Sequence, residues 1–338
     1  MSYYVGIDLH SDNNFVGILD KKETRILTKK LPNEIDEVLN TLKPFKRKIK
    51  GVVVESTYNW YWLVDGLMEK KYKVHLANPS QMQQYSGMKH TDDKYDSFWL
   101  AHMLRLGLLP EGYIYPKEIR PIRDLLRRRL RLVQQRTSHV LSLQSMINRN
   151  TGRKLNVSAT KKLSEKELNE LFPNEYLVMS ALSSVDVIAF LNKHISKIEK
   201  AILKEVKLRY PFEKLVTVNG IGDILGITIM LETGDINRFP RVSDYSSYSR
   251  CVSSERLSNG KKKGENNRKN GNRYLAWAYV EASNFMRRYC SDARSWHQRK
   301  AANTNQIVAT KALSNKIAKA CYFIIKDQIE FDPKKLFR

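Results

Sequence analysis

Cysteine is scarce in this sequence, and no metal-binding spacing of cysteine and histidine occurs. The 338 residues hold Cys251, Cys290 and Cys321, far apart from one another, and seven scattered histidines. Structural zinc sites take their ligands from closely spaced pairs of these residue types. The sequence therefore gives no support to a zinc finger or a disulfide scaffold, and its few thiols fit a reducing cytoplasm.

Long apolar runs are lacking as well. A helix that spans a bilayer needs about 20 predominantly apolar residues, and we expect no such segment. Residues 3–9 already read as structure, so we expect no N-terminal signal. Both observations favour a cytoplasmic protein that does not span a membrane.

Acidic residues are outnumbered by basic ones. The chain holds 59 Lys and Arg against 35 Asp and Glu, a formal net charge of +24. Residues 1–100 hold 15 basic and 13 acidic residues, whereas the remaining 238 hold 44 and 22. Such an excess indicates a polyanionic partner, either nucleic acid or an anionic membrane surface. We expect an intracellular DNA- or RNA-binding protein. Its first hundred residues should form an ordinary globular domain, and the residues after them should carry the basic surface.

Residues 1–116 predict an α/β domain. A short continuous apolar run at 51–55 is typical of a central strand buried on both faces. Three strands come first as a meander, and strands and helices then alternate, which predicts a mixed sheet with helices on its faces. The expected strands are 3–9, 14–20, 24–29, 51–55 and 73–77, and the expected helices are 33–42, 58–70, 79–86 and 93–106.

Residues 117–209 predict a long helical hairpin. Its first helix, from 118 to 150, is basic, and its apolar residues recur close to a heptad that Arg129 and Arg136 interrupt. A polar, Lys-rich loop is expected at 150–163, and a second helix from about 175 to 209. Two such helices suit a dimerisation arm, a nucleic-acid clamp, or both.

Residues 210–338 predict a second, mainly helical domain. Gly220 and Gly222 form a turn before a helix and could expose backbone N–H groups to a phosphate, as in half of a helix-hairpin-helix element. A tight turn without a ligand explains these glycines equally well. The stretch 258–272 is the most polar in the chain and predicts an irregular loop. The expected helices are 224–232, 273–287 and 309–328.

Basic clusters and the glycine turn are the expected nucleic-acid contacts. The arginines of the first long helix fit a solvated face as well as they fit a nucleic-acid surface. The predicted contacts are Arg127, Arg128, Arg129, Arg131, Gly220, Gly222, Lys261, Lys262, Lys263, Arg268, Lys269 and Arg273.

Four carboxylates of the first domain lie at the ends of their elements. Asp8 ends the first strand, Glu55 ends the central strand, and Asp93 and Asp96 share one face at a helix start. Each alone fits a turn or a helix cap. Together they predict a site where a cation offsets their repulsion, and hard oxygen ligands suit Mg²⁺. Two Mg²⁺ ions about 4 Å apart would stabilise the attacking and leaving oxygens of a phosphoryl transfer.

The order of these four carboxylates along the chain resembles that of Holliday-junction resolvases, which have an RNase H-like fold. It resembles more closely that of the DEDD transposases of insertion sequences, which also carry a catalytic serine. The resemblance covers nearly the whole chain in two blocks that flank the hairpin. No single stretch is specific, and their joint order carries the resemblance. The matching stretches are Val5-Gly6-Ile7-Asp8, Val54-Glu55-Ser56-Thr57, Tyr61-Trp62-Leu63, Asn78-Pro79, Lys89, Asp93-Lys94-Tyr95-Asp96, Leu100-Ala101, Gly220-Ile221-Gly222, Glu232-x-Gly234-Asp235, Arg238-Phe239 and Gly271-Asn272-Arg273.

The resemblance implies a serine nucleophile. In that family Ser followed by Gly precedes a basic, Gly-rich loop that ends in Gly-Asn, which corresponds to Ser258 here. The sequence departs from the pattern at Asn259, where Gly is usual, at the lead-in 250–253, and at Ser97, where Ala is usual. These departures leave less favoured alternatives, which are Ser253 or Ser254 for Ser258 and Asp92 for Asp93.

The resemblance further implies DNA strand exchange. Ser258 would attack a backbone phosphate and form a covalent phosphoserine link, with Asp8, Glu55, Asp93 and Asp96 holding Mg²⁺. The family uses a structured noncoding RNA of its element to choose donor and target DNA, and the composite site implies a homo-oligomer, a dimer or a tetramer. Two rivals remain, a junction-resolving nuclease that never uses Ser258 and a non-enzymatic nucleic-acid-binding protein.

Overall fold

A computed structural model describes residues 2–82, 93–206, 210–265 and 270–337. The chain divides into two compact units, Met1–Lys117 and Glu118–Arg338. The first boundary lies one residue from the expected one. The helical hairpin and the C-terminal region, which the sequence separates at residue 209, fall within the second unit.

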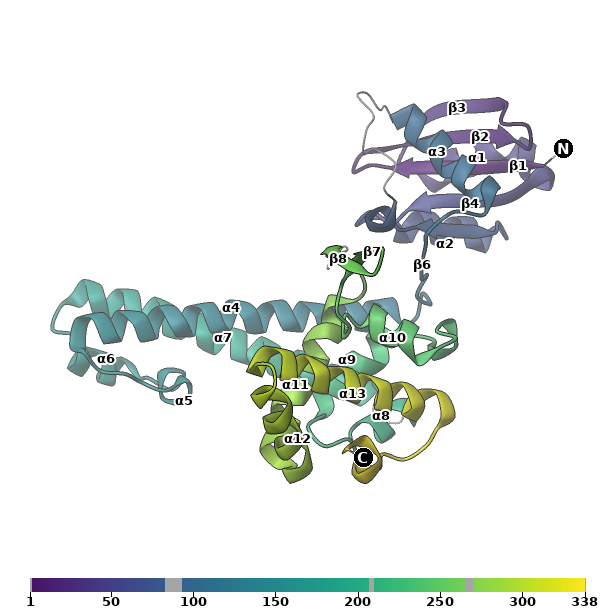
Figure 1. Ribbon diagram of the computed structural model, residues 1–338. Helices are drawn as coiled ribbons and strands as arrows, with labels where there is room; N and C mark the ends of the chain where they lie inside the picture. Colours follow the sequence, from purple (N-terminus) through teal and green to yellow (C-terminus); the bar gives the residue numbers. More distant parts are fainter. Residues whose placement is uncertain (1, 83–92, 207–209, 266–269, 338) are drawn as a thin grey trace. The chain divides into compact units, whose positions relative to one another are not determined.

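The first unit is built on a mixed sheet. Strands β1 (Tyr3–Leu9), β2 (Asn13–Asp20) and β3 (Arg25–Pro32) form an antiparallel meander. Strand β4 (Ile49–Glu55) pairs parallel with β1, β5 (Val74–Ala77) pairs parallel with β4, and the short β6 (Glu111–Gly112) closes the edge. The strand order is β3-β2-β1-β4-β5-β6 (Figure 1).

Helices cover both faces of this sheet because its central strands are apolar on both sides. Helices α1 (Ile35–Leu42) and α2 (Tyr61–Glu69) share one core with Val5, Ile7 and Val52. Helix α3 (Asp93–Leu106) packs on the other face. There a Cβ added at Gly6 would collide with the carbonyl oxygen of Ser97. This close approach keeps the start of α3 beside β1.

The expected elements of the first unit are largely confirmed. All five expected strands are present, and α3 has the expected bounds. The short helices η1 (Lys43–Lys48) and η2 (Pro79–Gln81) and strand β6 were not expected. The helix expected at 79–86 is wrong at its start, where the chain forms only η2, and most of its remainder lies outside the described residues.

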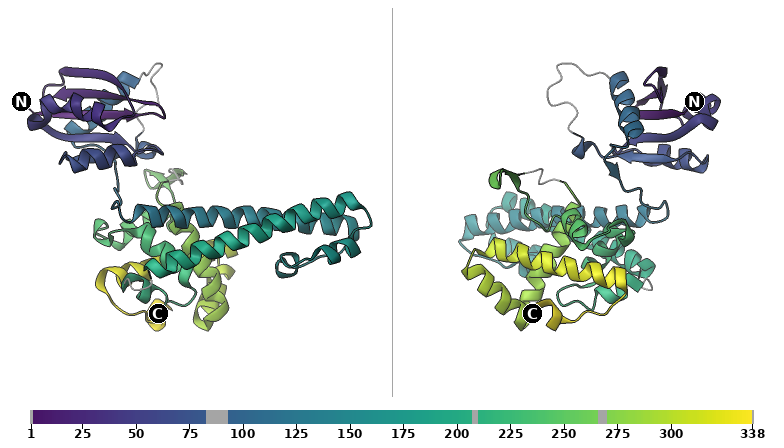
Figure 2. Two further views of the ribbon diagram at one scale, coloured as in Figure 1. Left: turned by 180° about the vertical axis from the view of Figure 1, so that it is seen from behind. Right: turned by 45° about the vertical axis from the view of Figure 1, so that its right-hand side comes forward.

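The second unit begins with two long antiparallel helices, α4 (Arg120–Thr151) and α7 (Glu175–Val206), which lie side by side (Figure 2). The arginines that interrupt the apolar pattern of α4 have partners on α7. Arg136 donates to Asn192 Oδ1 at 2.7 Å, and Arg129 pairs with Glu199. Polar cross-links therefore alternate with buried residues such as Leu132 and Val140 along the hairpin.

The hairpin tip contains more structure than expected. Residues 157–171 hold the short helices α5 (Val157–Thr160) and α6 (Glu165–Leu171) rather than only a loop. Helix α6 begins with a capping box, in which Ser164 and Glu167 satisfy each other's backbone N–H groups. That Ser-x-x-Glu signal is visible in the sequence.

One helix bears on the expectation about membrane spans. By length and composition α7 could cross a bilayer, with a mean hydropathy of 1.3 over its most apolar window and 22% of that window buried. A single helix of this kind is weak evidence for membrane insertion, and α7 packs along α4 on one side.

The rest of the second unit is helical around one core. Helices α9 (Asp223–Thr233), α11 (Arg273–Tyr289) and α13 (Gln306–Asp327) lie close to their expected positions. The remaining helical segments, which the sequence did not predict, are α8 (Tyr210–Leu215), η3 (Ile236–Arg238), α10 (Val242–Tyr248), α12 (Ser291–Ala302) and α14 (Pro333–Phe337). An RNase H-like sheet domain followed by a mainly helical region is thus confirmed as the fold class.

The stretch expected as an irregular loop contains a β-hairpin. Strands β7 (Arg256–Ser258) and β8 (Lys261–Gly264) pair antiparallel around a two-residue turn (Figure 1). Both turn residues have positive φ, 50° at Asn259 and 70° at Gly260. Asn-Gly is the favoured sequence for such turns, because both residue types tolerate the left-handed region. The expectation of an irregular loop at 258–264 is therefore wrong.

Candidate active site and nucleic-acid surface

Asp8 lies near the carboxyl end of β1 and is 4% exposed. His10 follows two residues later, and its Nε2 lies 3.1 Å from Asp8 Oδ2. The backbone oxygen of His10 accepts hydrogen bonds from Asn33 at 3.0 Å and Asn59 at 2.9 Å. Two side chains from distant parts of the chain thus fix the turn that follows Asp8.

Glu55 lies at the carboxyl end of β4, the parallel neighbour of β1. Burial raises the pKa of Glu55 to about 7, with further contributions from the charge of Asp8, a hydrogen bond with Asp8 and the charge of Asp96, whereas the charge of His10 lowers it. Like charges held together disfavour ionisation in this way. The sheet and α3 therefore bring Asp8, Glu55 and Asp96 into one electrostatic neighbourhood, as the sequence predicted.

The Asp pair lies at the start of α3. Asp93 is the first residue of the helix, and Asp96 follows one turn later. Asp92, the alternative to Asp93, and Lys89 lie outside the described residues. Among the described side chains, no three His, Cys, Asp or Glu groups stand close enough to form a ready metal cage. The oxygen donors of Asp8, Glu55 and Asp96 nevertheless fit a divalent cation. Glu55 is buried, and the charges of Asp8 and Asp96 act on it, so a cation would offset both the burial of its carboxylate and their mutual repulsion.

Ser258 lies at the tip of the β7–β8 hairpin, as the last residue of β7. It is exposed, and its cross-strand partner is Lys261. Lys262 is paired with Leu257 instead, so Lys261 and Lys262 project to opposite faces of the hairpin. The alternatives Ser253 and Ser254 precede β7. The tip thus combines a hydroxyl and an ammonium group on neighbouring positions of one face.

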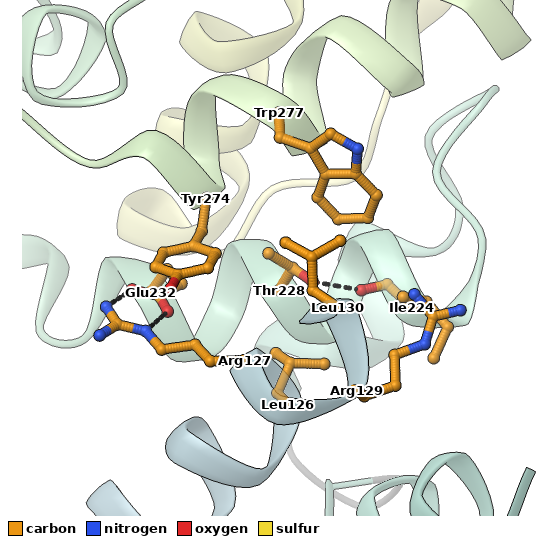
Figure 3. A pocket seen from close by; sticks show the side chains of 9 residues that line it. All are labelled: Leu126, Arg127, Arg129, Leu130, Ile224, Thr228, Glu232, Tyr274 and Trp277. Carbon is orange, nitrogen blue, oxygen red and sulfur yellow. Dashed lines mark hydrogen bonds and ion pairs between the residues drawn. The ribbon is translucent and has the colours of Figure 1, made fainter. Parts of the chain in front are cut away.

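The arginine cluster of α4 is divided between internal ion pairs and the surface. Arg127 donates to Glu232 through Nε at 2.6 Å and Nη2 at 2.8 Å, and its guanidinium lies 4.4 Å from the Tyr274 ring centroid (Figure 3). Arg129 is paired with Glu199. Arg128 and Arg131 are exposed. Nucleic-acid contact stays a prediction for all four, and the internal pairs give Arg127 and Arg129 a structural role in addition.

The glycine turn before α9 borders a hollow of about 630 Å³, lined also by Phe285 and Tyr289. Gly220 has a φ of +88°, and a Cβ there would lie 2.5 Å from Ala282 O of α11. Packing therefore requires a glycine at 220. No atom lies within 4 Å of a Cβ at Gly222, so packing leaves Gly222 unexplained. A phosphate contact at this turn remains a prediction.

The remaining predicted contacts lie at or near the Ser258 hairpin. Lys261, Lys262 and Lys263 belong to β8 and are exposed, and Arg273 is the first residue of α11. Arg268 and Lys269 lie outside the described residues.

Sequence reasoning missed the roles of His10 and Glu232. Glu232 is completely buried. Its carboxylate forms ion pairs with Arg123 and Arg127 and accepts a hydrogen bond from Asn272. Burial tends to raise its pKa, but the hydrogen bond from Arg127, the charges of Arg123 and Arg127 and the hydrogen bond from Asn272 hold that pKa below the ordinary value. Both Glu232 and Asn272 belong to stretches that carried the family resemblance, which was the available signal.

Two stretches of the chain match families of known proteins. Residues 5–150, which include the sheet unit and its carboxylates, match the IS110 DEDD transposase family, described as "Transposase". Residues 213–298, which include Glu232 and the Ser258 hairpin, match the "Transposase IS116/IS110/IS902 family". This chain belongs to the IS110-type transposases.

A relative aligns in sequence with nearly the whole of this transposase. It is a "Probable family 20 transposase" of Pseudomonas aeruginosa, 22% identical over 341 residues that cover 97% of this chain and 98% of the relative. The IS110-type transposase is thus an insertion-sequence enzyme that cleaves and recombines DNA, and its DEDD-type domain indicates dependence on a divalent metal.

Proposed function

We propose that this transposase exchanges DNA strands through a covalent phosphoserine formed at Ser258, with Asp8, Glu55, Asp93 and Asp96 as the ligands of Mg²⁺. The observation that carries the proposal is the convergence of Asp8, Glu55 and Asp96. Burial, together with the charge of Asp8, a hydrogen bond with Asp8 and the charge of Asp96, raises the pKa of Glu55 to about 7. Carboxylates gathered at such a cost to their ionisation are typical of functional sites.

The carboxylates supply the electrostatic half of the chemistry. A pair of bound Mg²⁺ ions would supply Lewis-acid stabilisation of the phosphate oxygens. Asp8 and Glu55 project from neighbouring parallel strands, so the sheet fixes their separation. His10 is partly exposed, and its Nε2 lies 3.1 Å from Asp8 Oδ2.

Ser258 supplies the nucleophile. Its Oγ forms a bond to phosphorus while the bond from phosphorus to the departing deoxyribose oxygen breaks. The hydroxyl loses its proton and the departing oxygen gains one, so the step consumes no co-reactant. Lys261, the cross-strand partner of Ser258, brings positive charge toward the non-bridging phosphate oxygens. The proposal requires both units to act on one phosphate, within one protomer or across two.

The test is an adduct trap. Wild-type protein, Ser258→Ala and Ser253→Ala are incubated with labelled DNA of the insertion sequence, the RNA that co-purifies with the protein and Mg²⁺, and denatured samples are separated by size. We expect a protein–DNA adduct in the wild type and in Ser253→Ala, and none in Ser258→Ala, because alanine has no hydroxyl to join to phosphorus. Peptide mapping of the adduct should locate the nucleotide on Ser258.

Two outcomes contradict the serine route. Strand exchange by Ser258→Ala would exclude Ser258 as the nucleophile. Cleavage by the wild type without any adduct would favour a junction-type nuclease that uses water.

Metal binding should depend on pH through Glu55. The free carboxyl of Glu has a pKa of 4.5, whereas Glu55 has about 7 in the folded chain. A raised carboxyl pKa means that the fold loses stability as pH rises between these values, and a cation that binds the ionised form offsets the loss. We expect Mg²⁺ to increase the hydrogen-exchange protection of β1 and β4 more at about pH 8 than at about pH 5.5. In Glu55→Gln this pH dependence of the Mg²⁺ effect should disappear, and an unchanged dependence would exclude Glu55 as a ligand.

We also propose that an RNA of the element guides the choice of DNA. The support is a large basic surface without a base-reading motif such as a zinc finger in the sequence. Sequencing of the RNA that co-purifies and survives nuclease digestion should yield one structured transcript from beside the transposase gene. Recovery of random cellular RNA alone would contradict guidance.

A homo-oligomer completes the proposal. The outer face of α7 exposes Tyr176, Met179 and Phe190, each more than half accessible. Apolar side chains gathered on one helix favour contact with another protein surface, and a second copy is the partner that a composite site implies. Light scattering that shows only monomers under strand-exchange conditions would contradict it.

A further inference from the structure

The segment that carries Ser258 leaves and re-enters the helical core through a hydrogen-bonded stem. On the leaving side, Cys251 N donates to Ser246 O at 2.9 Å, and Asn315 Nδ2 donates to Cys251 O at 3.3 Å. Between the two sides, Arg250 Nε donates to Gly271 O at 3.0 Å. Asn272 N donates to Tyr248 O at 2.5 Å. The two ends of the segment are therefore held to each other.

Glycine is required at the re-entry point. Gly271 has a φ of +89°, and a Cβ there would collide with the carbonyl oxygen of Tyr248. The close approach of the two chains at this point leaves no room for a side chain. Asn272, the next residue, is consequently held at a fixed place and is 7% exposed.

The side chain of Asn272 connects three elements. Its Oδ1 accepts from Tyr274 N at 2.8 Å and from Leu275 N at 3.1 Å, so it caps α11. Its Nδ2 donates to Glu232 Oε2 of α9 at 2.7 Å. That same Oε2 is 2.9 Å from Arg123 Nη2 of α4. One amide therefore joins the stem to α9 and, through a buried carboxylate, to the long helix α4.

We propose that Asn272 is a positioning residue for Ser258, which acts by fixing the stem of the serine segment to the buried Glu232–arginine cluster. The proposal rests on the phosphoserine route proposed above. A serine on an exposed hairpin reaches a phosphate in line only if the base of that hairpin is fixed, because reaction depends on alignment of the attacking oxygen. The cap alone does not require an amide, since a serine hydroxyl caps a helix as well as asparagine does.

The substitution Asn272→Ser separates these two roles. Serine keeps an oxygen that accepts from the first-turn N–H groups and removes the amide that donates to Glu232. Asn305→Ser is the matched control, because Asn305 caps α13 by accepting from Val308 N at 2.9 Å and is exposed. A second variant, Arg250→Met, removes the hydrogen bond from Arg250 Nε to Gly271 O and so weakens the stem at another place. It keeps the proposal testable if Asn272→Ser fails to fold.

The full-length variants are compared in single-turnover adduct formation at saturating DNA. We expect Asn272→Ser and Arg250→Met to form the Ser258 adduct at least about tenfold more slowly, as expected for loss of alignment, with DNA affinity in Asn272→Ser unchanged within about twofold. Asn305→Ser should match the wild type in both. Adduct formation by folded Asn272→Ser at the wild-type rate would overturn the proposal.

Hydrogen exchange distinguishes this proposal from the proposed function. Amides of residues 246–251 and 270–272 should lose protection in Asn272→Ser and keep it in Asn305→Ser, whichever nucleophile the enzyme uses. If the wild type forms no Ser258 adduct, the phosphoserine route fails, and the exchange data then report on the stem alone. Unchanged protection in Asn272→Ser would overturn the stem itself.

Discussion

Asp8→Asn is expected to reduce DNA cleavage by at least about a thousandfold, because it removes a full negative charge from the centre of the carboxylate site and weakens its hold on Mg²⁺. Asparagine has nearly the same shape, so packing in the sheet is kept. The fold should be kept, because the substitution also removes the charge of Asp8, which adds to the effect of burial in raising the pKa of Glu55. The measurement is single-turnover cleavage of labelled DNA at saturating Mg²⁺, together with hydrogen exchange of β1.

Asp20→Asn is the matched control for this prediction. Asp20 is 2% exposed, lies on the neighbouring strand β2, and accepts from Lys22 N at 2.8 Å and Thr24 N at 2.9 Å in a turn. An asparagine oxygen can accept the same bonds, so cleavage should stay near the wild-type rate. Equal rates for Asp8→Asn and the wild type would exclude Asp8 from the site.

Glu232→Ala is expected to destabilise the second unit by about 3–5 kcal/mol, the usual cost of removing one partner of a buried ion pair. Arg123 and Arg127 would lose their shared carboxylate, and the Arg123 side chain is 9% exposed. Hydrogen exchange of α9 and α11 amides measures the effect, and protection factors should fall by more than about a hundredfold.

Glu199→Ala provides the comparison for the second prediction. Glu199 also joins an arginine of α4 to another helix, but its side chain is 33% exposed. An ion pair near solvent contributes about 1 kcal/mol or less. Similar losses in both variants would contradict the importance of the buried Glu232 cluster.

The sheet unit was predictable from sequence because its signals are local. The apolar run of β4 and the alternation of strands and helices each occupy a few neighbouring residues, and the carboxylates stand at element ends where the topology brings them together. The electrostatic contact of Glu55 with Asp8 and Asp96 follows from the parallel pairing of β1 with β4 and the packing of α3 on Gly6.

The arginine pairs were not predictable because their partners are distant. Arg127 and Glu232 are separated by 105 positions, and Arg129 and Glu199 by 70. No pattern within α4 shows which arginines bind carboxylates of their own chain. The hairpin at Ser258 was missed for another reason. The high Gly and Asn content suggested an irregular loop, although the pair Asn259-Gly260 is itself a turn signal.

The cluster of Glu232, Arg123 and Arg127 lies near one end of the long helix α4. From Arg127 to Thr151, helix α4 rises about 36 Å at 1.5 Å per residue. A rotation of about 10° at the cluster would therefore displace the hairpin tip by about 6 Å along an arc of that radius. The same cluster holds Asn272 at the stem of the serine segment. Any partner that binds the hairpin tip would thus contact the protein about 36 Å along α4 from the cluster that holds the stem of the serine segment.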